Sequence, residues 1–130
     1  MSGKDITIFS VVASVLLFSV ELSAHHGVAL YDVSRIIDVT GTVTDFQFVN
    51  PHVHIFFDVT EEDGAVERWS AELTTPIRLR EVDGWNRDTL KPGNEISITG
   101  SPATDGAPSM WVEQIFIDGN PLLIRSGGAG

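Results

Sequence analysis

The sequence predicts a mostly β protein, a small five-stranded OB-like Greek-key barrel with one short helix between its third and fourth strands. Three observations predict it. Segments rich in β-branched and aromatic residues alternate apolar with polar positions, turn residues separate these segments, and a helical pattern interrupts the series once. A flatter five-stranded sandwich is the alternative. We expect residues 25–125 to form a single domain, because a chain of 130 residues leaves too little for a second core.

Residues 1–24 have the pattern of a secretory signal peptide ahead of this domain. Lys4 precedes an uncharged apolar run from Ile6 to Val20, and a polar stretch then ends at the small residue Ala24. This run is shorter than the roughly 20 residues that a membrane-spanning helix needs; an uncleaved membrane anchor is the alternative. We therefore expect a periplasmic or secreted protein without membrane attachment after signal cleavage, and a disordered glycine-rich tail at residues 126–130.

The first strand is expected within residues 35–48. Its apolar residues occupy odd positions up to Val43 and even positions from Phe46 onward. A β-bulge near Thr44 would return both sets to the same face of the sheet. Asn50-Pro51 ends the strand, because proline has no N–H to donate and restricts the residue before it.

The second and third strands are expected to form a hairpin. A two-residue Asp63-Gly64 turn would place the apolar face of one strand against the polar face of the other. A three-residue loop, Glu62-Asp63-Gly64 with Gly64 left-handed, keeps the faces matched. This register pairs Phe57 with Trp69 in the core, and pairs Asp58 with Arg68 and His54 with Glu72 on the outside.

The pattern changes to a helical one at residues 74–82. Pro76 suits the first turn of a short helix, and Asp83-Gly84 ends it. Trp85 follows, and we expect its large ring to fill one end of the core. The last two strands are expected at residues 94–100 and 110–118.

Composition excludes several classes of function. The chain has 18 acidic against 8 basic residues, a formal charge of -10, which argues against nucleic acid as a partner. It contains no cysteine, which excludes disulfides, thiolate zinc sites, iron–sulfur clusters and cysteine nucleophiles. No spacing matches a nucleophile elbow, a catalytic triad or a phosphate loop. We therefore expect a protein that is not an enzyme.

The four histidines form two pairs that are candidate metal ligands. His52 and His54 have the spacing that places both imidazoles on one face of a strand, about 7 Å apart at their bases. Glu72, opposite His54, is expected to orient the second ring nitrogen of that histidine. His25 and His26 stand at the predicted mature start.

The exact cleavage position decides what the chain start can offer a metal. After cleavage behind Ala24, His25 carries a free α-amine beside its imidazole, which is a bidentate nitrogen chelate. After cleavage behind Ser23, the start becomes Ala24-His25-His26, which also suits Cu(II) or Ni(II). Nitrogen ligands favour copper, nickel or zinc, and we expect Cu(II). The alternative for each pair is that it binds no metal. His52 and His54 would then be a surface pair on the strand, and His25 and His26 would belong to a solvated tail at the chain start.

Several motifs stand together in a characteristic order: Ala24-His25-His26-Gly27, Tyr31-Asp32, Asn50-Pro51-His52, Leu90-Lys91-Pro92-Gly93 and Gly100-Ser101-Pro102. In this order the chain resembles a family of small exported bacterial proteins catalogued as a domain of unknown function. The resemblance spans residues 25 to about 119 and implies a mostly β periplasmic protein with no established activity. Its motifs include His25, His26 and His52 but not His54, which favours His52 together with the N-terminal pair.

The sequence thus predicts a periplasmic binding module that holds Cu(II) through His25, His26 and His52, with His54 as a further candidate. The alternative is a metal-free adaptor or accessory domain that binds an unidentified periplasmic protein or an oligosaccharide. A copper-dependent oxidase built on an N-terminal histidine is a third interpretation. Asn50, Pro51, Gly64, Trp69 and Trp85 are expected to have structural roles.

Overall fold

The computed structural model describes residues 30–122 and 124. The predicted signal peptide, residues 1–24, and the predicted tail, residues 126–130, lie outside the described residues. Within them the chain forms, in order, β1 (Ile37–Gln47), β2 (His54–Thr60), β3 (Val66–Glu72), α2 (Pro76–Asp83), β4 (Glu95–Pro102), β5 (Ser109–Ile117) and β6 (Asn120–Leu122). In this part of the chain, no helix is long and apolar enough to cross a membrane.

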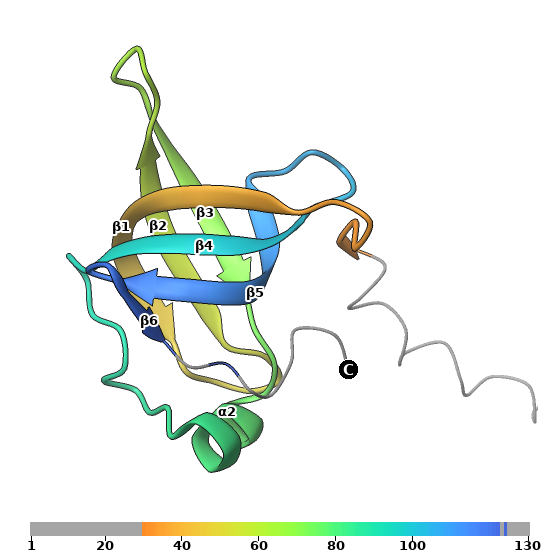
Figure 1. Cartoon of the computed structure of the whole chain (residues 1–130), viewed down its shortest axis with the longest axis vertical. Helices are drawn as coiled ribbons and strands as arrows, with labels where there is room; N and C mark the ends of the chain where they lie inside the picture. The colour runs from red at the N-terminus through yellow and green to blue at the C-terminus, as the bar shows by residue number, and fades with distance from the viewer. Residues whose placement is uncertain (1–29, 123, 125–130) are drawn as a thin grey trace, which may run out of the picture.

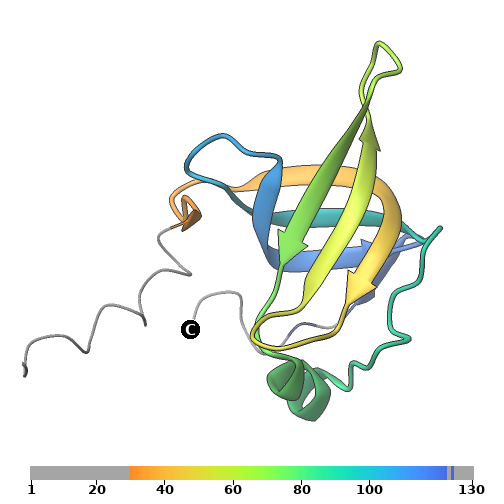
Figure 2. The ribbon, with the colours of Figure 1, turned by 180° about the vertical axis from the view of Figure 1, so that it is seen from behind.

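The strands form a closed barrel. Their order in the sheet is β3-β2-β1-β4-β5-β6, and a further parallel pairing of β3 with β5 closes the ring. The helix α2 comes between β3 and β4 in the sequence and lies beneath one end of the barrel (Figure 1). The hairpin of β2 and β3 projects beyond the opposite end, as the view from behind shows (Figure 2). This is the predicted OB-like barrel with one short helix.

The predicted bulge in β1 is confirmed. The register between β1 and β2 shifts between Val43 and Asp45. The shift keeps Val43 and the later Phe48 on the inside, where both are buried. As a result one long strand pairs with β2 along one half and with β4 along the other.

The predicted hairpin register is also confirmed. Phe57 pairs with Trp69, Asp58 with Arg68, and His54 with Glu72. Gly64 has a φ of 86°, the left-handed conformation that the three-residue loop requires. Phe57 is fully buried, whereas Trp69 is only partly buried and its Nε1 donates to Glu67.

The helix α2 has the expected ends. The hydroxyl of Thr75 caps its start, Pro76 occupies the first turn, and Gly84 ends it in the left-handed conformation with a φ of 73°. Trp85 follows and is buried, as predicted. It belongs to a core that also contains Phe57, Ile55, Leu79, Leu90, Ile96, Ile98, Met110 and Ile115.

The short strand β6 is an element that the sequence analysis missed. Asp118 and Gly119 both have positive φ, 49° and 81°, and form a two-residue turn that connects β5 to β6. A turn with two such residues matches the twist of a hairpin. Ile117 therefore pairs directly with Asn120.

Candidate functional site

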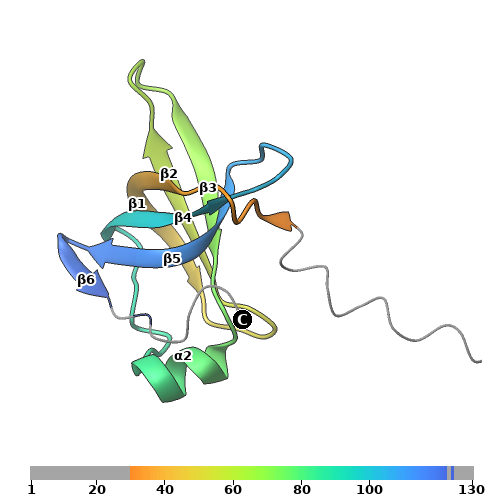
Figure 3. The same cartoon turned by 45° about the vertical axis from the view of Figure 1, so that its right-hand side comes forward.

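A polar cluster forms at the closure of the barrel. We call this closure the seam, meaning residues 70–72 of β3 and residues 109–111 of β5, which pair in parallel. The segment before β1 runs beside the loop between β4 and β5 (Figure 3), and Tyr31 in this segment forms an isolated β-bridge with Ala103. His52 lies just before β2. The chain therefore brings four separate segments to the seam.

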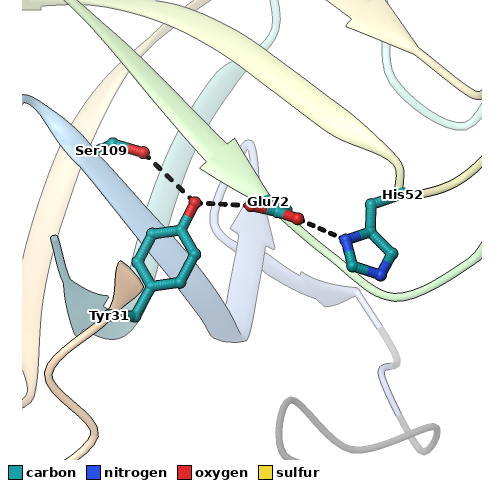
Figure 4. Close-up of polar contacts among 4 residues, drawn as sticks. All are labelled: Tyr31, His52, Glu72 and Ser109. Carbon is teal, nitrogen blue, oxygen red and sulfur yellow. Dashed lines mark hydrogen bonds and ion pairs between the residues drawn. The ribbon is translucent and has the colours of Figure 1, made fainter. Parts of the chain in front are cut away.

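The carboxylate of Glu72 is the centre of this cluster. One of its oxygens, Oε1, contacts Nδ1 of His52, and the other, Oε2, accepts a hydrogen bond of 2.6 Å from the hydroxyl of Tyr31 (Figure 4). The side chain of Glu72 is 13% exposed and that of His52 is 31% exposed. A carboxylate with so little water around it depends on these two neighbours for its hydrogen bonds.

Tyr31 is a permanent donor in this cluster. Burial first, and then its hydrogen bond to Glu72, raise the pKa of the Tyr31 phenol to about 12. The phenol therefore keeps its proton at neutral pH. Its oxygen lies 3.4 Å from the hydroxyl of Ser109, which in turn accepts a hydrogen bond of 3.0 Å from Ser70.

Trp111 packs against both aromatic members of the cluster. The centroid of one of its rings lies 6.0 Å from that of Tyr31, and His52 meets it edge-on at 5.7 Å. Such tilted and edge-on contacts are favourable for aromatic rings. Trp111 therefore restricts how the phenol and the imidazole can lie around the carboxylate.

His54 has different surroundings. Its ring stacks on Phe56 at a centroid distance of 6.2 Å and an interplanar angle of 16°. Glu72 is its partner in the strand register, but the Glu72 carboxylate contacts His52 instead. The expectation that Glu72 orients His54 is therefore wrong. The reason is that a long side chain also reaches diagonal neighbours, and here Tyr31 holds it on the side of His52.

The predicted metal ligands are only partly visible. His25 and His26 lie outside the described residues. Among residues 30–122 and 124, no group of three histidine, cysteine, aspartate or glutamate side chains could hold a metal ion. Of the predicted ligands that belong to the favoured set, the described residues include His52. Its Nε2 atom has no partner in this part of the chain, and its Nδ1 atom contacts a carboxylate. Metal-binding histidines usually have such a carboxylate at the ring nitrogen that does not bind the metal.

Tyr31 and the seam serines are site residues that the sequence analysis did not assign. Tyr31 is the single tyrosine of the chain and belongs to the quoted motif Tyr31-Asp32, a signal that could have drawn attention to it. Asn50 and Pro51 separate β1 from β2, as expected, and lead directly into His52.

Comparisons with known proteins give one family and several similar solved structures. A family model described as a family of unknown function, DUF6152, matches residues 12–110. No curated protein matches the sequence.

Among solved structures, two crystal forms of the mitochondrial single-stranded DNA-binding protein Rim1 from S. cerevisiae are similar. One has 12% identity and a TM-score of 0.48, covering 66% of this chain and 95% of that chain. The other has 9% identity and a TM-score of 0.48, covering 66% and 94%. A tRNA fluorescent labeling enzyme has 17% identity and a TM-score of 0.42, covering 66% of this chain and 18% of that chain.

Proposed function

The chain belongs to the family of unknown function DUF6152, and from that premise we propose that it is an exported, periplasmic binding module for a divalent transition metal. The ion is Cu(II), and its ligands are His25, His26 and His52. The pattern of residues 1–24 supports export, because it has the charge, apolar run and small final residue of a secretory signal.

The observation that carries the metal proposal is the position of Tyr31 next to Glu72. The hydroxyl of Tyr31 donates to the same carboxylate that contacts His52. His26 and His25 precede Tyr31 by only five and six positions. Six residues of extended chain span at most about 20 Å, so the short connection to Tyr31 limits how far the two N-terminal histidines can lie from the seam and allows them to reach it.

The chemistry of the donors supports Cu(II). His52 has one nitrogen, Nε2, left for a metal, and its ring is partly exposed. Imidazoles and an α-amine are nitrogen donors, and among divalent first-row metals such donors bind copper most strongly. The chain has no cysteine thiolate that would favour a softer ion.

His54 is not part of the proposed ligand set. Its ring stacks on Phe56, and no carboxylate contacts either of its nitrogens among the described residues. Because it stands two positions after His52 and is also partly exposed, it offers a matched control for any substitution of His52.

The test is a calorimetric titration with Cu(II) of protein that begins at residue 25. We expect one equivalent to bind with sub-micromolar affinity and His52→Ala to weaken it by more than roughly 100-fold, since a ligand should matter at least as much as its outer partners. His54→Ala should leave the affinity unchanged. Equal losses in both variants, or binding that depends only on the free α-amine, would contradict the proposal.

A groove on the barrel supports the alternative, a metal-free adaptor that binds an oligosaccharide or a protein. It has a volume of about 430 Å³ and is lined by Thr44, Asp45, Gln47, Phe56 and Arg68. An aromatic ring among polar side chains suits such partners. Under this alternative, a partner co-purifies equally well with and without a chelator, and His52→Ala changes nothing.

A further inference from the structure

We infer that Tyr31 is the positioning residue of this site: its hydroxyl holds the Glu72 carboxylate against His52 and thereby fixes the tautomer in which Nδ1 carries the proton and Nε2 is free. As a property of a metal site this inference rests on the proposed function. The tautomer itself does not depend on any metal.

The first step is that Glu72 has two neighbouring histidines, His54 and His52. Its direct partner across the strands is His54, yet its carboxylate contacts His52. The other carboxylate oxygen is held at 2.6 Å by Tyr31. The position of Tyr31 therefore determines which histidine the Glu72 carboxylate contacts.

The second step is that Tyr31 is itself well anchored. Tyr31 is 8% exposed, its backbone forms a bridge with Ala103, and the N–H of Asp32 donates to the carbonyl of Pro102 at 2.8 Å. Its ring packs against Trp111. A donor fixed at both backbone and ring can hold a carboxylate in one orientation.

The third step follows the direction of the hydrogen bonds. The hydroxyl of Ser70 donates to Ser109, and the hydroxyl of Ser109 is close enough to donate to the Tyr31 oxygen. Tyr31 keeps its own proton because burial and Glu72 raise its pKa to about 12, so it donates to Glu72.

An ionised carboxylate only accepts hydrogen bonds. In the neutral ring, His52 must therefore donate from Nδ1, and this tautomer has its lone pair on Nε2.

Isolated histidine disfavours this tautomer. A large population of it at His52 is therefore a measurable effect of the contacts around the ring. Without the Tyr31 hydroxyl, one oxygen of Glu72 loses its donor and the carboxylate can turn toward His54, its neighbour in the register. The protein would then present a mixture of His52 tautomers, of which only one offers Nε2 to an ion.

The test uses Tyr31→Phe, which removes the hydroxyl and keeps the ring that packs against Trp111. The readout is the nitrogen spectrum of the imidazoles in metal-free protein, where long-range proton–nitrogen correlations distinguish the tautomers. We expect His52 to be almost wholly Nδ1-protonated in the parent and a mixture in Tyr31→Phe. Ser34→Ala is the control, because among the described residues that hydroxyl bonds to Asp32, outside the cluster.

An Nε2-protonated His52 in the parent, or an unchanged His52 in Tyr31→Phe, would overturn the inference. In a second arm, Tyr31→Phe should weaken Cu(II) binding by roughly 10- to 100-fold, the range for loss of an outer partner of a metal ligand. If the parent binds no Cu(II), the proposed function fails while the tautomer result still decides the role of Tyr31.

Discussion

Two histidines that stand two positions apart have very different surroundings. His52 contacts a nearly buried carboxylate and meets Trp111 edge-on, whereas the His54 ring stacks on Phe56 and makes no side-chain hydrogen bond among the described residues. They share residue type, strand region and partial exposure. The carboxylate that contacts His52 is also bonded by Tyr31, which reaches the seam from another part of the chain. Spacing along a strand therefore identifies candidate ligands, whereas the neighbouring side chains determine which candidate has a carboxylate partner.

The same contrast extends to the two ends of the β2–β3 pair. At the seam, Glu72 is held by two buried or half-buried partners. Toward the projecting tip, Asp58 contacts Arg68 at 3.1 Å, and these side chains are 33% and 66% exposed. Polar contacts at the seam should therefore contribute more to stability than those near the tip.

The largest effect is expected from crowding the closure of the barrel. In Gly100→Ala, a Cβ would lie 2.0 Å from the carbonyl oxygen of Trp111. The backbone must shift, at a cost of about 3 kcal/mol in the free energy of unfolding. In Gly64→Ala at the hairpin tip, the new Cβ has no atom within 4 Å. The only strain comes from the φ of 86°, which lowers the free energy of unfolding by about 1 kcal/mol. Urea unfolding measures the free energy of unfolding of both variants. Equal losses of stability would contradict the expected difference between the closure of the barrel and the hairpin tip.

A smaller effect is expected from removing the two carboxylates. Glu72→Ala leaves the buried hydroxyl of Tyr31 and Nδ1 of His52 without their acceptor, which should cost about 2 kcal/mol of stability. Asp58→Ala removes an exposed ion pair with Arg68 and should cost less than about 1 kcal/mol. Thermal unfolding of the two variants at one pH gives the comparison. A greater loss for Asp58→Ala would show that the seam network contributes little.

An effect confined to alkaline pH, and absent at neutral pH, is expected from the phenol of Tyr31. The pKa of Tyr31 is raised to about 12 from an ordinary value of 10.0. Below pH 10 the phenol is protonated in both folded and unfolded chains, so its contribution to stability is fully present there. The contribution is lost as the pH rises from about 10 to about 12.

Because Tyr31 is the single tyrosine, the ultraviolet absorbance of its phenolate measures this titration directly. Tyr31→Phe should lack both the absorbance change and this part of the alkaline loss of stability. A midpoint near pH 10 in the folded protein would mean that the phenol is neither buried nor bonded as described.

Much of the fold follows from local patterns. The matching of apolar faces was enough to predict the hairpin register, and the change of parity near Thr44 was enough to predict the bulge. Pro76 and Gly84 marked the two ends of the helix. The strand β6 was missed because it has only three residues, although Asp118-Gly119 is a typical hairpin turn.

The candidate site was predictable only in part. His52 and Glu72 were each identified from residue type and spacing, but their contact was not. The contact joins diagonal neighbours of the hairpin rather than direct partners, and Tyr31, which bonds the other oxygen of Glu72, comes from a distant segment that leaves no periodic pattern in the sequence. Alternation of apolar residues shows which face a side chain occupies and says nothing about which distant segment covers that face.

The closure at the seam also determines when the site can form. The hydroxyls of Tyr31 and Ser109 come from positions 78 residues apart. Contacts of such long range form late in folding, because closing a long loop costs chain entropy before the contact can repay it. A chain without β5 lacks Ser109 and Trp111, so it cannot complete the contacts around Tyr31 and His52. Only the complete barrel therefore has the whole set of contacts around Glu72.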